Sequence, residues 1–227
     1  MLYVALGDSI TFGYNCTNEK YYYTNIIFDS LKKSEPFLHQ YVLAKPGWRI
    51  SHLQKAVDKV PGCLWDETKY VTILIGGNDL LRAFPMLLHN ENRLTGYAQS
   101  FQKELDTLLQ KIKRPRMKIV LGTLYNPFPK SILAETCIQA FNDVVYRMGK
   151  RHRVKVVDLY RSFQVNEKRL IDGFRRGDLK DFKFFRGNPI HPTNLGHAKI
   201  ASMYLKSIHK QTAPKKRMPK QIQQADK

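Results

Sequence analysis

The chain carries a nearly unbroken apolar run at Val71-Thr72-Ile73-Leu74-Ile75, which leads directly into Gly76 and Gly77. Interior strands of a parallel sheet are buried on both faces and have such runs, whereas half-exposed antiparallel strands alternate apolar and polar residues. We therefore expect residues 71–75 to form a central strand of a parallel sheet that helices cover on both sides.

Runs of the same β-branched and apolar kind recur before and after this stretch, and segments with helical spacing separate them. The four further strands that we expect are Tyr3–Leu6, Tyr41–Ala44, Lys118–Leu121 and Val154–Val157. Each connection is long enough for a right-handed crossover. The sequence therefore predicts an α/β fold, a three-layer α/β/α sandwich around a five-stranded parallel sheet of the flavodoxin-like type.

Two long amphipathic helices are expected after the third and fourth strands. Thr95 is a possible N-cap of the first, and Ser131 is a possible N-cap of the second. Their inward stripes follow spacings of three and four: Tyr97, Phe101, Leu105, Leu108, Leu109 and Ile112 in the first, and Ala134, Ile138, Phe141, Val145 and Met148 in the second.

A last helix should begin near Thr193 or Asn194, just past Pro192, and turn Ile200, Met203, Tyr204 and Ile208 inward. The irregular region before it, from about residue 161 to 192, is too long for a simple loop and is expected to hold a short helix around residues 166–174. We expect one domain over residues 1–210, followed by a basic, disordered tail at residues 211–227.

The net charge of +19 over 227 residues is the one unusual property of the composition. It predicts attraction to anionic partners such as phospholipid surfaces or cell-wall polymers, although a generic solvated basic surface is an equal interpretation. Nucleic acid is not expected as a partner, because no helix-turn-helix, zinc motif or basic motif interleaved with aromatic residues occurs.

The expected location is cytoplasmic. The amino terminus enters a strand-like run at once, without a secretory signal, and no apolar stretch approaches the roughly 20 residues that cross a bilayer. The widely spaced Cys16, Cys63 and Cys137 are expected as free thiols in a reduced compartment. Association with a spore or cell surface stays open, and the histidines show no metal-ligand spacing with carboxylates or cysteines.

Four short motifs lie at expected strand ends or before the last helix. Gly7-Asp8-Ser9 follows the first strand and seats a serine in a turn that opens a helix, whose backbone N–H groups can stabilise negative charge. Gly47 follows the second strand, and Asn78 follows the third. His191 lies between Pro189 and Pro192, on a loop that proline stiffens.

With these four motifs in this order, the chain resembles the SGNH hydrolase superfamily of GDSL esterases and lipases. The serine, glycine, asparagine and histidine that define the superfamily match Ser9, Gly47, Asn78 and His191. The resemblance implies hydrolysis of acyl esters through a covalent acyl-enzyme, without a metal or organic cofactor. Ser9 would be the nucleophile and His191 its base. The oxyanion would be held by the N–H of Ser9, the N–H of Gly47 and the amide of Asn78.

One position departs from the family pattern. The superfamily usually has an aspartate three residues before the histidine, and this chain has Asn188 there. Three interpretations are open: Asn188 orients His191 in a slower enzyme, Asp178 or Asp181 takes the role, or turnover is weakened. In the third case the chain would be a binding protein that keeps the fold.

The substrate pocket is less clear from sequence. Trp48, Tyr22 and Tyr23 either line an acyl pocket or pack in the core, and Asp79 either borders the site or makes hydrogen bonds at a turn or helix start. The apolar stretch over residues 80–88 predicts either a lid or acyl-binding wall, or a core helix. Expected substrates are small acyl esters, lysophospholipids or acetylated carbohydrates.

Overall fold

The structure is a computed structural model that describes residues 1–164, 166–183 and 188–210. Five strands form one parallel sheet, and their order in space is β2-β1-β3-β4-β5, the flavodoxin-like order. They are β1 (Leu2–Gly7), β2 (His39–Ala44), β3 (Thr68–Leu74), β4 (Lys118–Gly122) and β5 (Lys155–Val157). The predicted fold class is confirmed, and β3 is the central strand, as the apolar run at residues 71–75 indicated.

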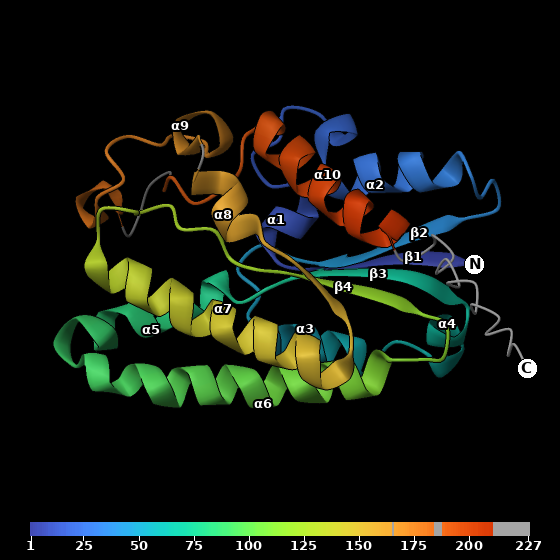
Figure 1. Cartoon of the computed structure of the whole chain (residues 1–227), viewed down its shortest axis with the longest axis horizontal. Coiled ribbons are helices and arrows are strands. Elements are labelled where there is room, and N and C mark those ends of the chain that lie inside the picture. Colours follow the sequence, from blue (N-terminus) through green and yellow to red (C-terminus); the bar gives the residue numbers. More distant parts are fainter. Residues whose placement is uncertain (165, 184–187, 211–227) are drawn as a thin grey trace, which may run out of the picture.

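Helices cover both faces of this sheet (Figure 1). One layer contains α2 (Tyr23–Lys32) and α10 (Asn194–Lys210), which pack on each other. The other contains α3 (Ile50–Val57), α6 (Leu94–Ile112) and α7 (Ile132–His152), with α6 between the other two. The remaining elements are α1 (Ser9–Phe12), η1 (Glu19–Tyr21), α4 (Gly62–Asp66), α5 (Gly77–His89), η2 (Glu91–Arg93), α8 (Leu159–Gln164), α9 (Glu167–Leu170) and η3 (Leu179–Asp181).

The start signals of two helices are confirmed. The side chain of Ser131 accepts a hydrogen bond from the backbone N–H of Ala134 at the start of α7, and that of Thr193 accepts one from Gly196 at the start of α10. The N-cap prediction for Thr95 is wrong. The short helix η2 runs directly into α6, so α6 begins at Leu94 and Thr95 lies inside its first turn.

The helix predicted around residues 166–174 is shorter than expected. It ends at Leu170, because Ile171 adopts an extended conformation and forms an isolated antiparallel bridge with Pro192. This bridge ties the region after α8 to the loop before α10. The two segments lie at the end of the molecule where the strands finish.

Two pairs of buried polar groups in the core are hydrogen-bonded, as low-dielectric interiors favour. The hydroxyl of Tyr204 on α10 donates to the carbonyl of Ile73 at 2.8 Å, and a Cβ added at Gly122 would come within 2.4 Å of that hydroxyl. The hydroxyl groups of Tyr3 and Thr72 are 2.9 Å apart. The first contact fixes α10 on the centre of the sheet, and the second joins β1 to β3.

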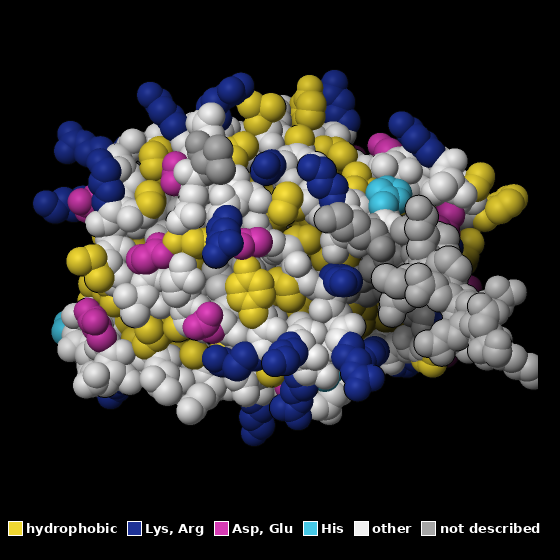
Figure 2. Space-filling model, viewed as in Figure 1, with side chains coloured by type: hydrophobic (Ala, Val, Ile, Leu, Met, Phe, Trp, Pro, Cys, Tyr) yellow, Lys and Arg dark blue, Asp and Glu magenta, His cyan; other side chains and the backbone are white. Residues whose placement is uncertain are grey.

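Lysine and arginine side chains are spread over the face seen in Figure 2 and do not gather in one patch. Cys16, Cys63 and Cys137 are free thiols, as predicted. Among the described residues, no helix is both long and apolar enough to span a membrane. The predicted tail at residues 211–227 lies outside the described residues.

Candidate active site

Ser9 is the first residue of α1, and Asp8 alone separates it from β1. The side chain of Asp8 caps this short helix by accepting a hydrogen bond from the backbone N–H of Ile10 at 3.0 Å. A Cβ added at Gly7 would lie 2.0 Å from the hydroxyl oxygen of Thr11 and 2.4 Å from the carbonyl oxygen of Leu74. Only glycine therefore fits where the strand turns into the helix, and this turn fixes the position of the Ser9 side chain.

His191 meets Ser9 across 182 positions of sequence, with Nε2 3.0 Å from Oγ. The ring of Tyr14 packs against the imidazole with centroids 4.8 Å apart. Burial lowers the pKa of His191, and the negative charge of Asp172 opposes that effect. The imidazole is therefore held neutral near pH 7, the state in which Nε2 can accept a proton from a hydroxyl group.

The side chain of Asn78, which follows β3, hydrogen-bonds to residues in the turns after β1 and β2. Asn78 is the second residue of α5, and its amide nitrogen donates to the carbonyl of Trp48 at 3.0 Å and lies 3.5 Å from a carboxylate oxygen of Asp8. Gly47 has a φ of +79°, a left-handed conformation that favours glycine. Ser9, Asn78 and His191 line one cavity, whereas Gly47 is not among its described lining residues.

Most of this cavity's lining is apolar; beyond Ser9, Asn78 and His191, its polar side chains are those of Asp8 and Asn126 among the described residues. Its walls come from α5, the first turns of α7, the loop after β4 and the segment around η3, and they include Leu81, Phe84, Phe128, Ala134, Ile138 and Phe182. The rings of Phe84 and Phe128 both meet the ring of Phe182 edge-on, at centroid distances of 6.2 and 6.0 Å. No lysine or arginine occurs among the described lining residues. The cavity therefore suits an uncharged, apolar group.

The stretch over residues 80–88 was expected to form either a lid or acyl-binding wall, or a core helix. Helix α5 is both a cavity wall and a core helix. Leu80, Ala83 and Leu87 are buried in the core, while Leu81 and Phe84 line the cavity with Leu80. The helix is thus a cavity wall whose position is fixed by core packing.

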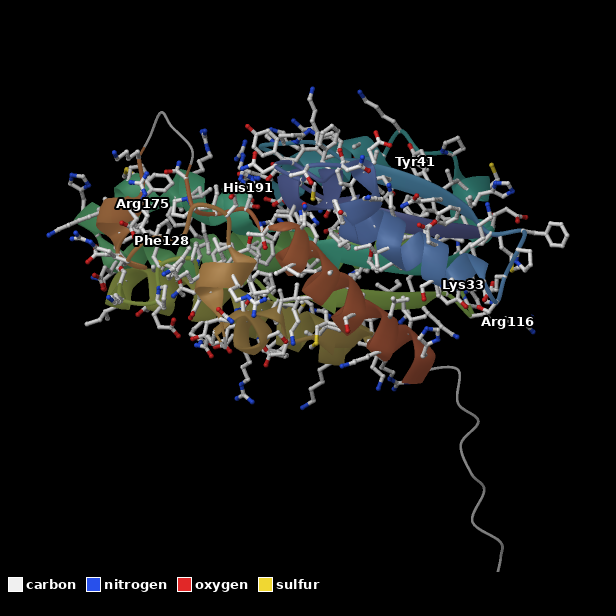
Figure 3. The ribbon with its side chains drawn as sticks, turned by 90° about the horizontal axis from the view of Figure 1, so that it is seen from above. Lys33, Tyr41, Arg116, Phe128, Arg175 and His191 are labelled. Carbon is white, nitrogen blue, oxygen red and sulfur yellow. The ribbon has the colours of Figure 1, made fainter. Side chains whose placement is uncertain are left out.

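The side chains of Trp48 and Asp79, which the sequence suggested as pocket residues, do not line the apolar cavity. Trp48 borders a separate shallow hollow with Tyr41 and His52, and Figure 3 shows Tyr41 well away from His191. Asp79 accepts a hydrogen bond from the backbone N–H of Ile50 at 3.1 Å, so it caps α3, a helix that lies 29 positions earlier in the sequence. Neither Trp48 nor Asp79 is among the described residues that line the apolar cavity.

Tyr23 also packs in the core. It is fully buried, and its hydroxyl oxygen lies 2.8 Å from that of Thr11.

The polar side chains considered as partners of His191 are engaged in local turns. The side-chain oxygen of Asn188 accepts the backbone N–H of Lys183 at 2.7 Å. Asp178 caps η3, and Asp181 accepts the backbone N–H groups of Arg176 and Gly177. Among the contacts of the described residues, none joins these three side chains to His191.

Sequence reasoning missed two neighbours of the histidine, Tyr14 and Asp172. Tyr14 follows the serine motif by five positions, and no motif marks it. Asp172 lies nineteen positions before His191 in the printed sequence, and only the bridge between Ile171 and Pro192 brings it close. In the part of the chain that the structure describes, no three His, Cys, Asp or Glu side chains gather in a group that could hold a metal ion.

Comparisons with known proteins agree with this architecture. The chain is 29% identical over 180 residues to the spore germination lipase LipC of Bacillus licheniformis, covering 73% of this chain and 83% of that protein. The crystal structure of the lipase Lip_vut3 from a goat rumen metagenome shares the fold, with a TM-score of 0.76, 23% identity and coverage of 91% of this chain and 97% of that one.

A variant of Axe2, an acetyl xylan esterase from Geobacillus stearothermophilus, has the same fold, with a TM-score of 0.65, 19% identity and coverage of 91% and 94%. The model of the GDSL-like Lipase/Acylhydrolase family matches residues 5–199, most of the chain. This chain therefore belongs to the GDSL-like lipase/acylhydrolase family, as its four motifs indicated, and is an esterase or lipase of that family.

Proposed function

We propose that the chain hydrolyses carboxylic esters of an apolar acyl group through an acyl-enzyme on Ser9, with His191 as general base. The observation that carries this proposal is the 3.0 Å approach of His191 Nε2 to Ser9 Oγ at the wall of the apolar cavity. That distance is within proton-transfer reach.

The reaction runs in two halves. Ser9 Oγ attacks the ester carbonyl while its proton passes to Nε2 of His191; the tetrahedral intermediate then collapses, and the alcohol leaves with that proton. A water molecule next attacks the acyl-enzyme, gives a proton to Nε2, and releases the carboxylic acid as the proton returns to Ser9. No other co-reactant is needed.

The negative charge of each intermediate would be met by the N–H of Ser9, the N–H of Gly47 and the amide of Asn78. The N–H of Ser9 lies at the start of α1, and Asn78 is held by the carbonyl of Trp48. Such preorganised donors need little rearrangement when charge develops.

The cavity favours an acyl chain of several carbons. An acetyl group would leave side chains such as Leu81, Phe84 and Phe182 uncovered, whereas a longer chain would bury apolar surface against them at about 25 cal/mol per Å². Among the substrate classes expected from sequence, a small acyl ester or a lysophospholipid therefore fits the cavity better than an acetylated carbohydrate, provided that its acyl chain is longer than acetyl.

Labelling with a fluorophosphonate, followed by mass spectrometry of the adduct, tests the nucleophile. We expect one adduct on Ser9 that is absent from Ser9→Ala. A folded chain with no adduct and no turnover of p-nitrophenyl esters would instead support the binding-protein alternative.

The acyl preference is tested with p-nitrophenyl acetate, butyrate and octanoate. We expect kcat/KM to be higher for butyrate and octanoate than for acetate. Ala134→Leu places a larger side chain in the cavity wall and should reduce octanoate turnover more than acetate turnover. Thr136→Leu on the exposed side of the same helix is the matched control and should leave the ratio unchanged.

A further inference from the structure

We propose that Asp172 provides the carboxylate that orients and stabilises the ring of His191, the role that the family pattern would give to position 188. This inference rests on the proposed esterase function of the same site. Asp172 is a positioning residue in this scheme, because it acts on the reaction only through His191.

The first observation is the register between two chain segments. The backbone N–H of Asp172 donates to the carbonyl of His191 at 2.8 Å, that of Thr193 donates to Leu170 at 2.9 Å, and Ile171 bridges Pro192 between them. This antiparallel register sets Asp172 directly opposite His191. Side chains directly opposite each other project from the same face, with Cβ atoms about 4.5–5.5 Å apart.

The second observation is that the carboxylate is held at this place. The amide nitrogen of Asn15 donates to one carboxylate oxygen of Asp172 at 3.2 Å. Asn15 follows Tyr14, whose ring packs on His191, and it has a φ of 67° that turns the chain sharply there. The segment after α1 therefore contacts both the imidazole and its opposing carboxylate.

The electrostatics agree with this geometry. Burial lowers the pKa of His191, and Asp172 is the charged group that raises it. Other titratable groups near the imidazole are Tyr14, whose ring packs on it, His197, whose pKa burial lowers to about 4, and Asp8, whose pKa burial raises to about 7. The imidazole of His197 is therefore neutral at neutral pH. The side chain of Asp8 is engaged as the N-cap of α1, next to Ser9. Asp172 is the carboxylate that faces the histidine across the bridge.

Asn188 is poorly suited to the role. Its side-chain oxygen, the atom that could accept an imidazole N–H, already accepts the backbone N–H of Lys183. An asparagine also lacks the charge that stabilises an imidazolium. With Asp172 as acceptor, the proton of the neutral imidazole resides on Nδ1, and Nε2 is free to take the proton of Ser9.

The test compares Asp172→Asn, Asn188→Ala and Asp29→Asn on the full chain. Asp29 is an exposed residue of α2 and controls for the change in net charge. We expect Asp172→Asn to lower kcat by about 10- to 100-fold with little change in KM. This is less than the roughly 10⁴-fold loss for a buried triad aspartate, because Asp172 is exposed.

A pH profile separates this role from a merely structural one. Removing the charge of Asp172 should move the acid limb of kcat/KM to lower pH, because the group that raises the pKa of His191 is gone. Asp172→Glu should restore part of kcat and move the limb back. Asp29→Asn should match the unmodified chain in both measurements.

Two results would overturn the inference. One is an Asp172→Asn variant that keeps normal kcat and an unmoved acid limb; the other is a larger loss of kcat in Asn188→Ala than in Asp172→Asn. Fluorophosphonate labelling of the unmodified chain distinguishes these results from failure of the proposed function. A labelled Ser9 keeps the hydrolase proposal intact even if Asp172 proves irrelevant.

Discussion

Replacing Asp79 by asparagine should stabilise the protein, and the gain should grow as pH rises. The Asp79 carboxylate accepts the backbone N–H of Ile50 at the start of α3. Burial raises its pKa from 3.8 to about 7, the charge of Glu104 adds to that effect, and the Ile50 N–H and Arg49 oppose it. Asparagine retains an oxygen that can accept the same hydrogen bond but never ionises.

The sign follows from proton binding. Between pH 3.8 and about 7 the folded chain holds a proton on Asp79 that the unfolded chain has released. The stability of the unmodified chain therefore falls as pH rises through this window, by up to about 1.4 kcal/mol per pH unit and about 4 kcal/mol in full. Because Asp79 is only half-buried and water screens its charge, we expect roughly half of this, about 2 kcal/mol.

Urea unfolding at pH 4, 6 and 8 measures the free energy of unfolding of both chains. The difference between Asp79→Asn and the unmodified chain should be smallest at pH 4 and largest at pH 8. The substitution also removes a negative charge that raises the pKa of Asp8. This lowers the free-energy cost of ionising Asp8 in the folded chain, so it adds to the gain in stability at high pH. Asp29→Asn is the exposed control; a stability difference for Asp79→Asn that stays flat, or shrinks with pH, would refute the reasoning.

Three further outcomes are expected. Asn78→Ala should lower kcat by about 10²–10³-fold with the fold retained by circular dichroism, because one oxyanion donor is lost; an undiminished kcat would remove Asn78 from the oxyanion site. The kcat/KM of the unmodified chain should rise with pH through a midpoint below 6.5, because burial lowers the pKa of His191 and the base must be neutral. Gly96→Ala within α6 should raise the free energy of unfolding by about 0.5–1 kcal/mol, because an added Cβ meets nothing within 4 Å, whereas Gly7→Ala should lower it because the added Cβ would clash with Thr11 and Leu74.

The fold could be predicted because its main signals are local. The apolar run at residues 71–75 requires burial on both faces, and Ser131 and Thr193 mark helix starts through hydrogen bonds to residues three positions on. The Thr95 N-cap prediction failed because η2 runs directly into α6, whereas the helix end near residue 170 is decided by a distant contact. The helix after Asn166 stops at Leu170 because the next residue pairs with Pro192, a partner that no local pattern reveals.

The approach of Ser9 and His191 was predictable for a related reason. The strand ends of a parallel sheet share one edge, which places Ser9 and Asn78 together. His191 lies on the loop before the last helix, and its pairing with Ser9 was expected from the resemblance to the SGNH superfamily. The cavity was not predictable in this way. Leu81, Phe84 and Ile138 belong to helices whose core-facing and cavity-facing residues have the same apolar spacing, and only their packing distinguishes the two.

Positive charge and the proposed acyl cavity are separated among the described residues. Lysine and arginine side chains are spread over the face seen in Figure 2, and none occurs among the described residues of the apolar cavity. Among the described residues, positive charge near an anionic headgroup or surface therefore lies outside the cavity, and Arg175 lies near the same end as Phe128 in Figure 3. Because the acyl group and any anionic group would occupy different environments, chain length should govern the reaction at Ser9, and ionic strength should govern encounter with a charged substrate.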